Sequence, residues 1–453
     1  MQRSFNLGHC DPLDLYLKLN PHGPGFLESC PPRSRIGRYS IVPLQIRDTF
    51  TLTDCGLLRQ ENGSTEQLAG DVFVRLAEIL TARAIPDRPG LPPFCGGFFG
   101  YFGYDLSRDI EVLPLHAERD LSLPRLWLSW VDTVACYDHL EKRLHLTSLD
   151  PQVDLDALKR RIRAAVAAPS LPATAVDHPP LQPLISATAY ADSVRHARDY
   201  IAAGDIYQAN LSCRFSGPPI ATPTDLYRAL RSINPSPFAC YLQTPQVTII
   251  SSSPERLVSL HDGVAETRPI AGTRPRGYTP PEDLRLGAEL LGNAKECAEH
   301  VMLVDLERND LGKVCRTGSV TVDELMTLER YSHVTHIVSN VRGELRPDCG
   351  PFDLLRATFP GGTITGVPKK RCMEIIEELE PAGRGVYTGS AGYIGANGRM
   401  DLNILIRTFQ QTADQLSYQV GAGIVADSDP QREWDECLAK GRAMQLSLRG
   451  ETP

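Results

Sequence analysis

The sequence lacks every cysteine pattern that is typical of a zinc site or a disulfide framework. Its 12 cysteines are scattered over 453 residues, with no CxxC pair and no Cys/His cluster at zinc-ligand spacing. It also lacks the run of about 18 apolar residues that a membrane-spanning helix requires, and no apolar segment of signal-peptide length follows residues 1–6. We therefore expect reduced thiols in a cytoplasmic protein with no membrane partner.

An excess of positive charge is also missing. Lys and Arg number 47 against 55 Asp and Glu, so the formal net charge is -8. Nucleic acids and anionic membranes attract proteins through concentrated positive charge. The composition thus argues against nucleic acid as a partner, while a few local arginines can still bind a small anion.

The chain is long enough for two or three ordinary domains or for one large core, and 42% of its residues are hydrophobic. Residues 1–167 alternate short β-type runs with Gly/Pro turns, which predicts a β-rich N-terminal domain. Residues 168–184 are rich in proline and predict a linker. Residues 185–450 alternate strand and helix patterns and predict a second domain; the fold class, α+β, is what the family resemblance given below implies.

The segment AKECAEHVMLVDLERNDLGKV, residues 294–314, predicts an amphipathic helix with Val301, Val304 and Leu306 on its packed side. Glu296 and Glu299 are three residues apart, so they are neighbours on the helix surface. Such a like-charge contact costs stability unless a cation joins the pair.

A second pair, Glu433 and Glu436, repeats this spacing on a helix that is predicted to begin at Pro430. Two carboxylate pairs offer oxygen ligands to one hard cation, and Mg²⁺ prefers such ligands. Two unrelated solvated helix faces are the alternative.

Two glycine loops suggest anion binding but not nucleotide binding. GGTITGVPK places Gly361 and Gly366 at P-loop separation, yet Val367 and Pro368 stand where Lys and Ser or Thr are needed. In GAGIVA, residues 421–426, no helix follows directly as a dinucleotide fingerprint requires. The backbone N–H groups of both loops can still hold a carboxylate.

Each of three single residues has a functional interpretation and a purely structural or surface one. Arg407, in the predicted strand DLNILIRTF, is suited to bidentate carboxylate binding or to a surface ion pair. Glu255 follows a predicted strand, where it is either a positioned acid or a solvated carboxylate. His336 lies in the apolar run VTHIVSNV and is either functional or a satisfied core histidine.

In chain order, ten segments between about residues 186 and 448 resemble the chorismate-utilising enzyme family. They are DIYQANLS, SSSPERL, PIAGTRPRG, EHVMLVDLERNDLG, RYSHVTHIVSNV, PGGTITGVPK, MEIIEELEP, YTGSAGYIG, IRTF and GAGIVADSDP. FLES, GRYSIV and GGFFGYFGYDLSR in the N-terminal half resemble the members that add an amino group. The resemblance implies two large antiparallel β-sheets packed between layers of helices, and Mg²⁺-dependent displacement of the C4 hydroxyl of chorismate.

The resemblance also implies roles for the matching positions. Glu299 and Glu436 would bind Mg²⁺ directly, with Glu296 and Glu433 binding it through water. Glu255 would protonate the leaving hydroxyl, since hydroxide is a poor leaving group. The remaining substrate-binding and catalytic positions are Arg407 and Tyr387, which would hold a substrate carboxylate, and Lys440, Gly421, Gly423, Thr363, Thr273 and His336.

Two positions bear on the product. Gln208 stands where members that add water carry a lysine base, which favours ammonia as the nucleophile. Ala271 stands where many aminodeoxychorismate synthases carry a nucleophilic lysine, and alanine cannot form that adduct. DIYQANLS and SSSPERL resemble the aminodeoxychorismate enzymes, whereas PIAGT resembles anthranilate synthases, and FLES with GRYSIV is similar to their tryptophan-feedback pocket.

We predict synthesis of 4-amino-4-deoxychorismate, for 4-aminobenzoate and folate, without a lysine adduct. In that case a separate glutamine amidotransferase subunit would supply the ammonia. Anthranilate synthesis, in which His336 would act at C2, is the alternative, and a non-catalytic chorismate-binding protein is the second alternative.

Overall fold

A computed structural model describes residues 1–30, 37–330 and 334–450 of the chain. Residues 331–333, which belong to the motif RYSHVTHIVSNV, lie outside this range. The described helices are α1 (Pro12–Leu19), α2 (Val72–Ala82), α3 (Leu155–Ala167), α4 (Ala187–Ala202), α5 (Pro223–Ile233), α6 (Pro280–Gly292), α7 (Ala294–Gly312), α8 (Pro351–Thr358), α9 (Lys369–Leu379) and α10 (Pro430–Leu448), with 3₁₀ turns η1 (Tyr104–Asp109) and η2 (Gly362–Ile364).

The described strands fall into an N-terminal and a C-terminal group. The first comprises β1 (Gln2–Asn6), β2 (Gly25–Glu28), β3 (Tyr39–Thr53), β4 (Gly56–Glu61), β5 (Ser64–Leu68), β6 (Gly97–Phe102), β7 (Leu126–Asp138) and β8 (Arg143–Ser148). The second comprises β9 (Gln182–Pro183), β10 (Gln208–Gly217), β11 (Phe238–Gln243), β12 (Thr248–Ser253), β13 (Arg256–His261), β14 (Val264–Thr267), β15 (Ile270–Pro275), β16 (Thr321–Arg330), β17 (Val334–Glu344), β18 (Gly366–Val367), β19 (Ser390–Gly395), β20 (Met400–Asn403), β21 (Thr408–Gln411) and β22 (Leu416–Ile424).

Neighbouring strands of the described ranges pair antiparallel, and the pairings join them into one continuous ladder. β6 pairs with β19, and β2 pairs with β11, so the ladder crosses from the first half of the chain to the second. The α+β class with large antiparallel sheet structure is confirmed. The division at residues 168–184 stays a prediction.

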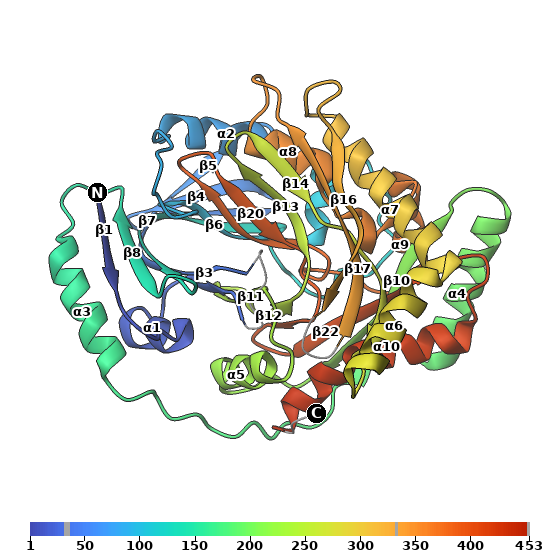
Figure 1. Ribbon diagram of the computed structural model, residues 1–453. Coiled ribbons are helices and arrows are strands. Elements are labelled where there is room, and N and C mark those ends of the chain that lie inside the picture. Colours follow the sequence, from blue (N-terminus) through green and yellow to red (C-terminus); the bar gives the residue numbers. More distant parts are fainter. Residues whose placement is uncertain (31–36, 331–333, 451–453) are drawn as a thin grey trace.

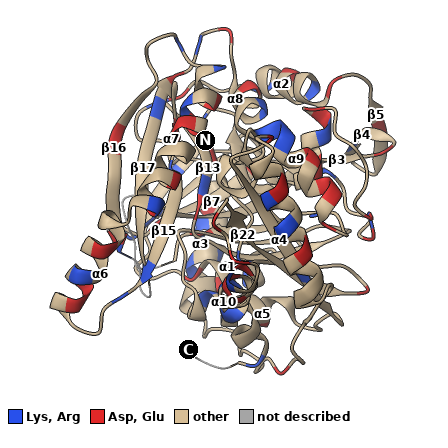
Figure 2. Ribbon diagram, turned by 90° about the vertical axis from the view of Figure 1, so that its right-hand side faces the viewer, with Lys and Arg blue, Asp and Glu red and all other residues tan. Residues whose placement is uncertain are grey.

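Helices cover the strands on several sides. In Figure 1, α4, α6, α7, α9 and α10 gather on the right of the strands, and α2 and α8 lie at the top. The buried strand β7 lies between β3 on one side and β6 with β8 on the other. No helix in the described ranges is both long and apolar enough to span a membrane. Lys, Arg, Asp and Glu are interspersed along α6 and α9 (Figure 2).

The proline-rich segment passes along the C-terminal helix without regular structure of its own. Residues 169–181 contain no helix or strand, and Figure 1 shows the chain running from α3 below the body of the molecule. It is nevertheless attached, because the backbone N–H of His178 donates to Leu448 O at 2.8 Å. The Gln445 side chain likewise donates to Leu181 O.

The apolar side of α7 differs from the prediction. Val304 is buried, but Val301 is 51% exposed, so its prediction as a packed residue was wrong. The buried face instead includes Glu307 and Asp310. Polar partners make this possible, since Thr267 donates to Glu307 and Lys369 pairs with Asp310.

The predicted strand DLNILIRTF is interrupted. β20 ends at Asn403 and β21 begins at Thr408, and Arg407 adopts a φ of 52° just before β21. A positive φ is uncommon for a residue with a side chain and is found where the surroundings enforce it. Arg407 therefore sits in a bend between strands rather than within one.

Candidate active site

The two predicted carboxylate pairs lie at the beginnings of α7 and α10. Asn293 caps α7 by accepting from the backbone N–H of Lys295 and Glu296. Asp429 caps α10, and Pro430 occupies its first turn, as the sequence predicted. Each cap fixes the first turn of its helix, and so the direction in which Glu296 and Glu433 leave the backbone.

Gln208 and the glycine strand β22 adjoin the first pair. The Gln208 side-chain N–H donates to Glu299 Oε1 at 2.7 Å, while Gln208 Oε1 is buried and has no donor within the described ranges. A Cβ at Gly423 would lie 2.4 Å from Gln208 Nε2 and 3.5 Å from Glu299 Oε1. Glycine is therefore needed at position 423 for these groups to meet.

The carboxylates of the two helices act on one another. Burial raises the pKa of Glu299, and the charges of Glu296 and Glu436 raise it further. Burial and Glu436 likewise raise the pKa of Glu433. Carboxylates that repel in this way, and that offer only oxygen donors, fit a hard divalent cation.

Protein cations also contact this set. Arg274 lies 3.1 Å from Glu296, and Lys440 lies 2.7 Å from Glu436. Within the described ranges, no group of three or more His, Cys, Asp or Glu side chains is arranged to hold a metal ion. The four predicted ligands are thus brought to one region but not into a finished coordination shell, and their roles stay predictions.

Arg407 has no carboxylate counter-ion in the part of the chain that the structure describes. Its side chain donates to Lys440 O at 3.2 Å, and no carboxylate of the described ranges lies within ion-pair distance. Burial lowers the pKa of its guanidinium, and the main opposing influence is the nearby Tyr387. A partly buried, unpaired guanidinium is costly to keep, and an anionic ligand would offset that cost.

Lys440 links Arg407 to the glycine strand. Its ammonium donates to Gly421 O at 2.9 Å while its backbone oxygen accepts from Arg407. Three predicted substrate-binding residues therefore form one contact chain. Tyr387 lies buried beside them.

Glu255 is the buried acid of the site. It lies between β12 and β13, is 6% exposed, and accepts from the hydroxyl of Thr363 at 2.9 Å. Burial raises its pKa to about 8, with the charge of Glu307 adding to the effect. Such a carboxyl is protonated at neutral pH and can donate a proton.

His336 lies on β17 opposite the strand that carries Ala271 and Thr273. Its Nδ1 lies 2.9 Å from Thr273 Oγ1, and burial lowers its pKa to about 4. The charge of Arg407 lowers it further, so His336 is close to the substrate-binding set. A neutral imidazole of this kind can accept a proton. Ala271 is buried and pairs with Ile337.

Two supporting arginines of the site were not predicted from the sequence. Arg384 is buried, lies over the Tyr387 ring at 5.7 Å, and donates to Ile364 O and Asn210 O. Arg274 pairs with Glu296, a member of the first carboxylate pair, at 3.1 Å. Arg384 also pairs with Glu380, four residues earlier, at 2.7 Å. The contacts that join the two arginines to the site, to Tyr387 and to Glu296, come from residues that no local sequence pattern connects with them.

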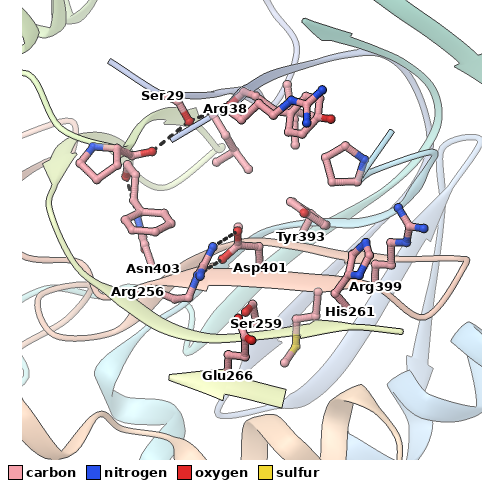
Figure 3. Close-up of a pocket in the computed structure, with 18 of the residues that line it drawn as sticks. Ser29, Arg38, Arg256, Ser259, His261, Glu266, Tyr393, Arg399, Asp401 and Asn403 are labelled. Carbon is pink, nitrogen blue, oxygen red and sulfur yellow. Dashed lines mark hydrogen bonds and ion pairs between the residues drawn. The ribbon is translucent and has the colours of Figure 1, made fainter. Parts of the chain in front are cut away.

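The structure also contains a separate cavity of about 360 Å³, whose lining residues are shown in Figure 3. Its lining brings together the N-terminal motifs FLES and GRYSIV, through Ser29 and Tyr39, with Phe238 and Tyr393 from the C-terminal half. Arg256, which pairs with Asp401 at 2.8 Å, forms part of its wall. Arg256 directly follows Glu255, so the cavity and the buried acid share one stretch of backbone.

Known proteins resemble this chain along most of its length. It is 45% identical over 440 residues to the anthranilate synthase component 1 of Thermus thermophilus, covering 96% of this chain and 94% of that protein. It is 46% identical over 428 residues to the aminodeoxychorismate synthase component 1 of Bacillus subtilis, covering 92% and 90%. The crystal structure of anthranilate synthase component I from Streptococcus pneumoniae matches with a TM-score of 0.80 at 34% identity, covering 97% and 99%.

The family comparison agrees with these relatives. Residues 49–446 match the family model described as chorismate binding enzyme. This range contains all the predicted site residues. The chain belongs to the chorismate-binding enzyme family.

Proposed function

We propose that this protein adds ammonia to chorismate and forms anthranilate and pyruvate, as component I of a two-component synthase. The observation that carries the proposal is the unpaired guanidinium of Arg407 in one site with the buried acid Glu255. Chorismate offers what both need, a carboxylate and a hydroxyl leaving group. The Thermus relative and Ala271, which cannot form a lysine adduct, support anthranilate as the product.

Different residues of the site bind the substrates and donate the proton in the first step. Arg407 and Tyr387 hold a substrate carboxylate, and Gln208 Oε1 accepts an N–H of ammonia, for which no protein donor competes within the described ranges. Ammonia bonds to C2, the ring double bonds shift, and the C4–O bond breaks. Glu255 gives its proton to the departing hydroxyl, which leaves as water, and loss of a proton from the new ammonium restores neutrality.

A second proton transfer completes the aromatic ring. His336 takes the C2 proton, the C3–O bond breaks, and a proton is returned to the methylene carbon of the leaving enolpyruvyl group, which departs as pyruvate. Mg²⁺, when bound by Glu299 and Glu436, would neutralise a substrate carboxylate. Chorismate and ammonia are thereby converted to anthranilate, pyruvate and water.

Synthesis of 4-amino-4-deoxychorismate is the second candidate. The 46% identity to the Bacillus subtilis aminodeoxychorismate synthase component 1 favours it. Product analysis separates the two: chorismate, ammonium and Mg²⁺ should give fluorescent anthranilate without a further enzyme. Formation of 4-aminobenzoate only after aminodeoxychorismate lyase is added would overturn the anthranilate assignment. In both cases we propose a glutamine amidotransferase as the natural ammonia donor.

Replacing a predicted metal ligand should change the Mg²⁺ requirement. We expect Glu299→Gln to raise the Mg²⁺ concentration for half-maximal activity by at least about tenfold, because one ligand charge is lost. The measurement is the rate of chorismate consumption against Mg²⁺ concentration. Asp305→Asn is the matched control, since Asp305 lies exposed on the same helix and, among the described residues, pairs only with Arg308. An unchanged Mg²⁺ dependence in Glu299→Gln would refute the ligand assignment.

We also propose that the cavity in Figure 3 binds tryptophan and that bound tryptophan inhibits the enzyme. Its volume suits a small molecule, and Arg256 in its wall directly follows Glu255 in the chain. Tyr39→Ala should raise the tryptophan concentration for half inhibition about tenfold by removing an aromatic contact. Tyr200→Ala is the control, because Arg371 covers Tyr200 at 5.1 Å much as Arg38 covers Tyr39 at 5.0 Å. Equal inhibition of both variants and the wild type would exclude this site.

A further inference from the structure

Glu307 is a buried carboxylate on α7 to which the proposed reaction assigns no role. It is 5% exposed, and it accepts from the Thr267 hydroxyl at 2.9 Å and from the backbone N–H of Gly362. The nearby lysines contact a different carboxylate: Lys369 lies 2.5 Å from Asp310, and Lys313 lies 2.8 Å from it. The direct hydrogen-bond donors to Glu307 are therefore neutral groups.

The 3₁₀ turn η2 connects Glu307 to Glu255, the acid of the site. Gly362 begins η2, and the next residue, Thr363, donates to Glu255 at 2.9 Å. Helix α7 packs closely against this turn, because a Cβ at Gly362 would lie 2.4 Å from Leu306 Cδ2 and 3.4 Å from Glu307 Oε1. Hydrogen bonds thus connect Thr267, Glu307, the η2 turn and Glu255 in sequence.

We propose that Glu307 is a positioning residue for Glu255. Its carboxylate holds the Gly362 amide, and so fixes the turn from which Thr363 orients the Glu255 carboxyl. Its negative charge, once formed, also opposes ionisation of Glu255 and keeps the proton on the acid. The inference rests on the proposed function only for its kinetic readout.

The charges around the pair set the direction of the pH effect. Burial raises the pKa of Glu307 to about 7, Asp310 raises it and Lys369 lowers it. The pKa of Glu255 is about 8, and Lys440 is the facing cation that lowers it. The negative charge of Glu307 raises the pKa of Glu255, so removal of that charge should let Glu255 ionise at a lower pH.

The test is the pH profile of Glu307→Gln, with Glu377→Gln as a matched control. Glu377 is another buried carboxylate, but it pairs with Arg108 away from this chain of contacts. We expect Glu307→Gln to lower kcat about tenfold, to leave KM for chorismate unchanged, and to move the alkaline limb of kcat down by about one pH unit. An alkaline limb at the wild-type pH, or the same changes in Glu377→Gln, would overturn the proposal.

Two further measurements keep the inference testable in every case. If Glu307→Gln does not fold, Thr267→Val removes one donor to Glu307 without changing charge, and it should lower kcat with the KM unchanged. A wild-type kcat in Thr267→Val would overturn the proposal.

If the wild type consumes no chorismate, the proposed function fails by itself. Difference infrared titration of the carboxylic-acid C=O band then still tests the coupling, because Glu307→Gln should make Glu255 ionise at lower pH. An unchanged Glu255 titration would refute it.

Discussion

Replacement of Glu255 by glutamine should lower kcat for chorismate consumption by about 10²- to 10⁴-fold, the usual contribution of a general acid. Glutamine has nearly the same size and can still meet the Thr363 hydroxyl, so KM should change little. Glu378→Gln, on the surface of α9 beside Tyr200, should behave as the wild type. A Glu255→Gln enzyme that retains wild-type kcat with ammonium would remove the acid from the mechanism.

The same substitution should have a pH-dependent effect on stability. Burial raises the pKa of Glu255 from 4.5 to about 8, so the folded protein holds this proton more tightly than the unfolded chain. The associated stability is fully present below pH 4.5 and is lost as the pH rises through 8. At pH 9 Glu255→Gln should therefore exceed the wild type in unfolding free energy by on the order of a few kcal/mol and should melt at a higher temperature. At pH 4.5 the two proteins should melt at nearly the same temperature. Equal melting temperatures at pH 9 would contradict a buried acid.

Replacement of Arg407 by glutamine should weaken chorismate binding strongly. Loss of a buried partner to a carboxylate costs about 2–5 kcal/mol, or roughly 30-fold or more in affinity. The measurement is KM for chorismate, together with direct binding of chorismate in the absence of ammonium. Arg371→Gln is the control, because Arg371 is a surface arginine with its own partner, Asp205, at 2.8 Å. A KM within twofold of the wild type would show that Arg407 does not bind the substrate anion.

The sequence predicted the helices of this fold better than the details of its strands. The helix predicted in residues 294–314 is α7 (Ala294–Gly312), and the helix predicted to begin at Pro430 is α10 (Pro430–Leu448). The break in DLNILIRTF was not predictable, because its apolar pattern is that of a strand. The positive φ of Arg407 depends on distant chain segments that pack around it.

The candidate site shows the same division. The paired spacing at Glu296 and Glu299 and the glycines of β22 could be read from the sequence, and they meet through Gln208. The burial of Glu307 could not, because the partners that satisfy it, Thr267 and Gly362, lie on other elements. Local periodicity assigned the packed side to Val301, which instead faces solvent.

The most direct test is the fate of ¹⁵N-labelled ammonium with chorismate, Mg²⁺ and the purified protein. We predict labelled anthranilate with one equivalent of pyruvate. If the ¹⁵N label appears in 4-amino-4-deoxychorismate instead, the protein still aminates chorismate, but the product is not anthranilate. Chorismate that is not consumed, or that is converted to a product without ¹⁵N, would contradict amination at this site.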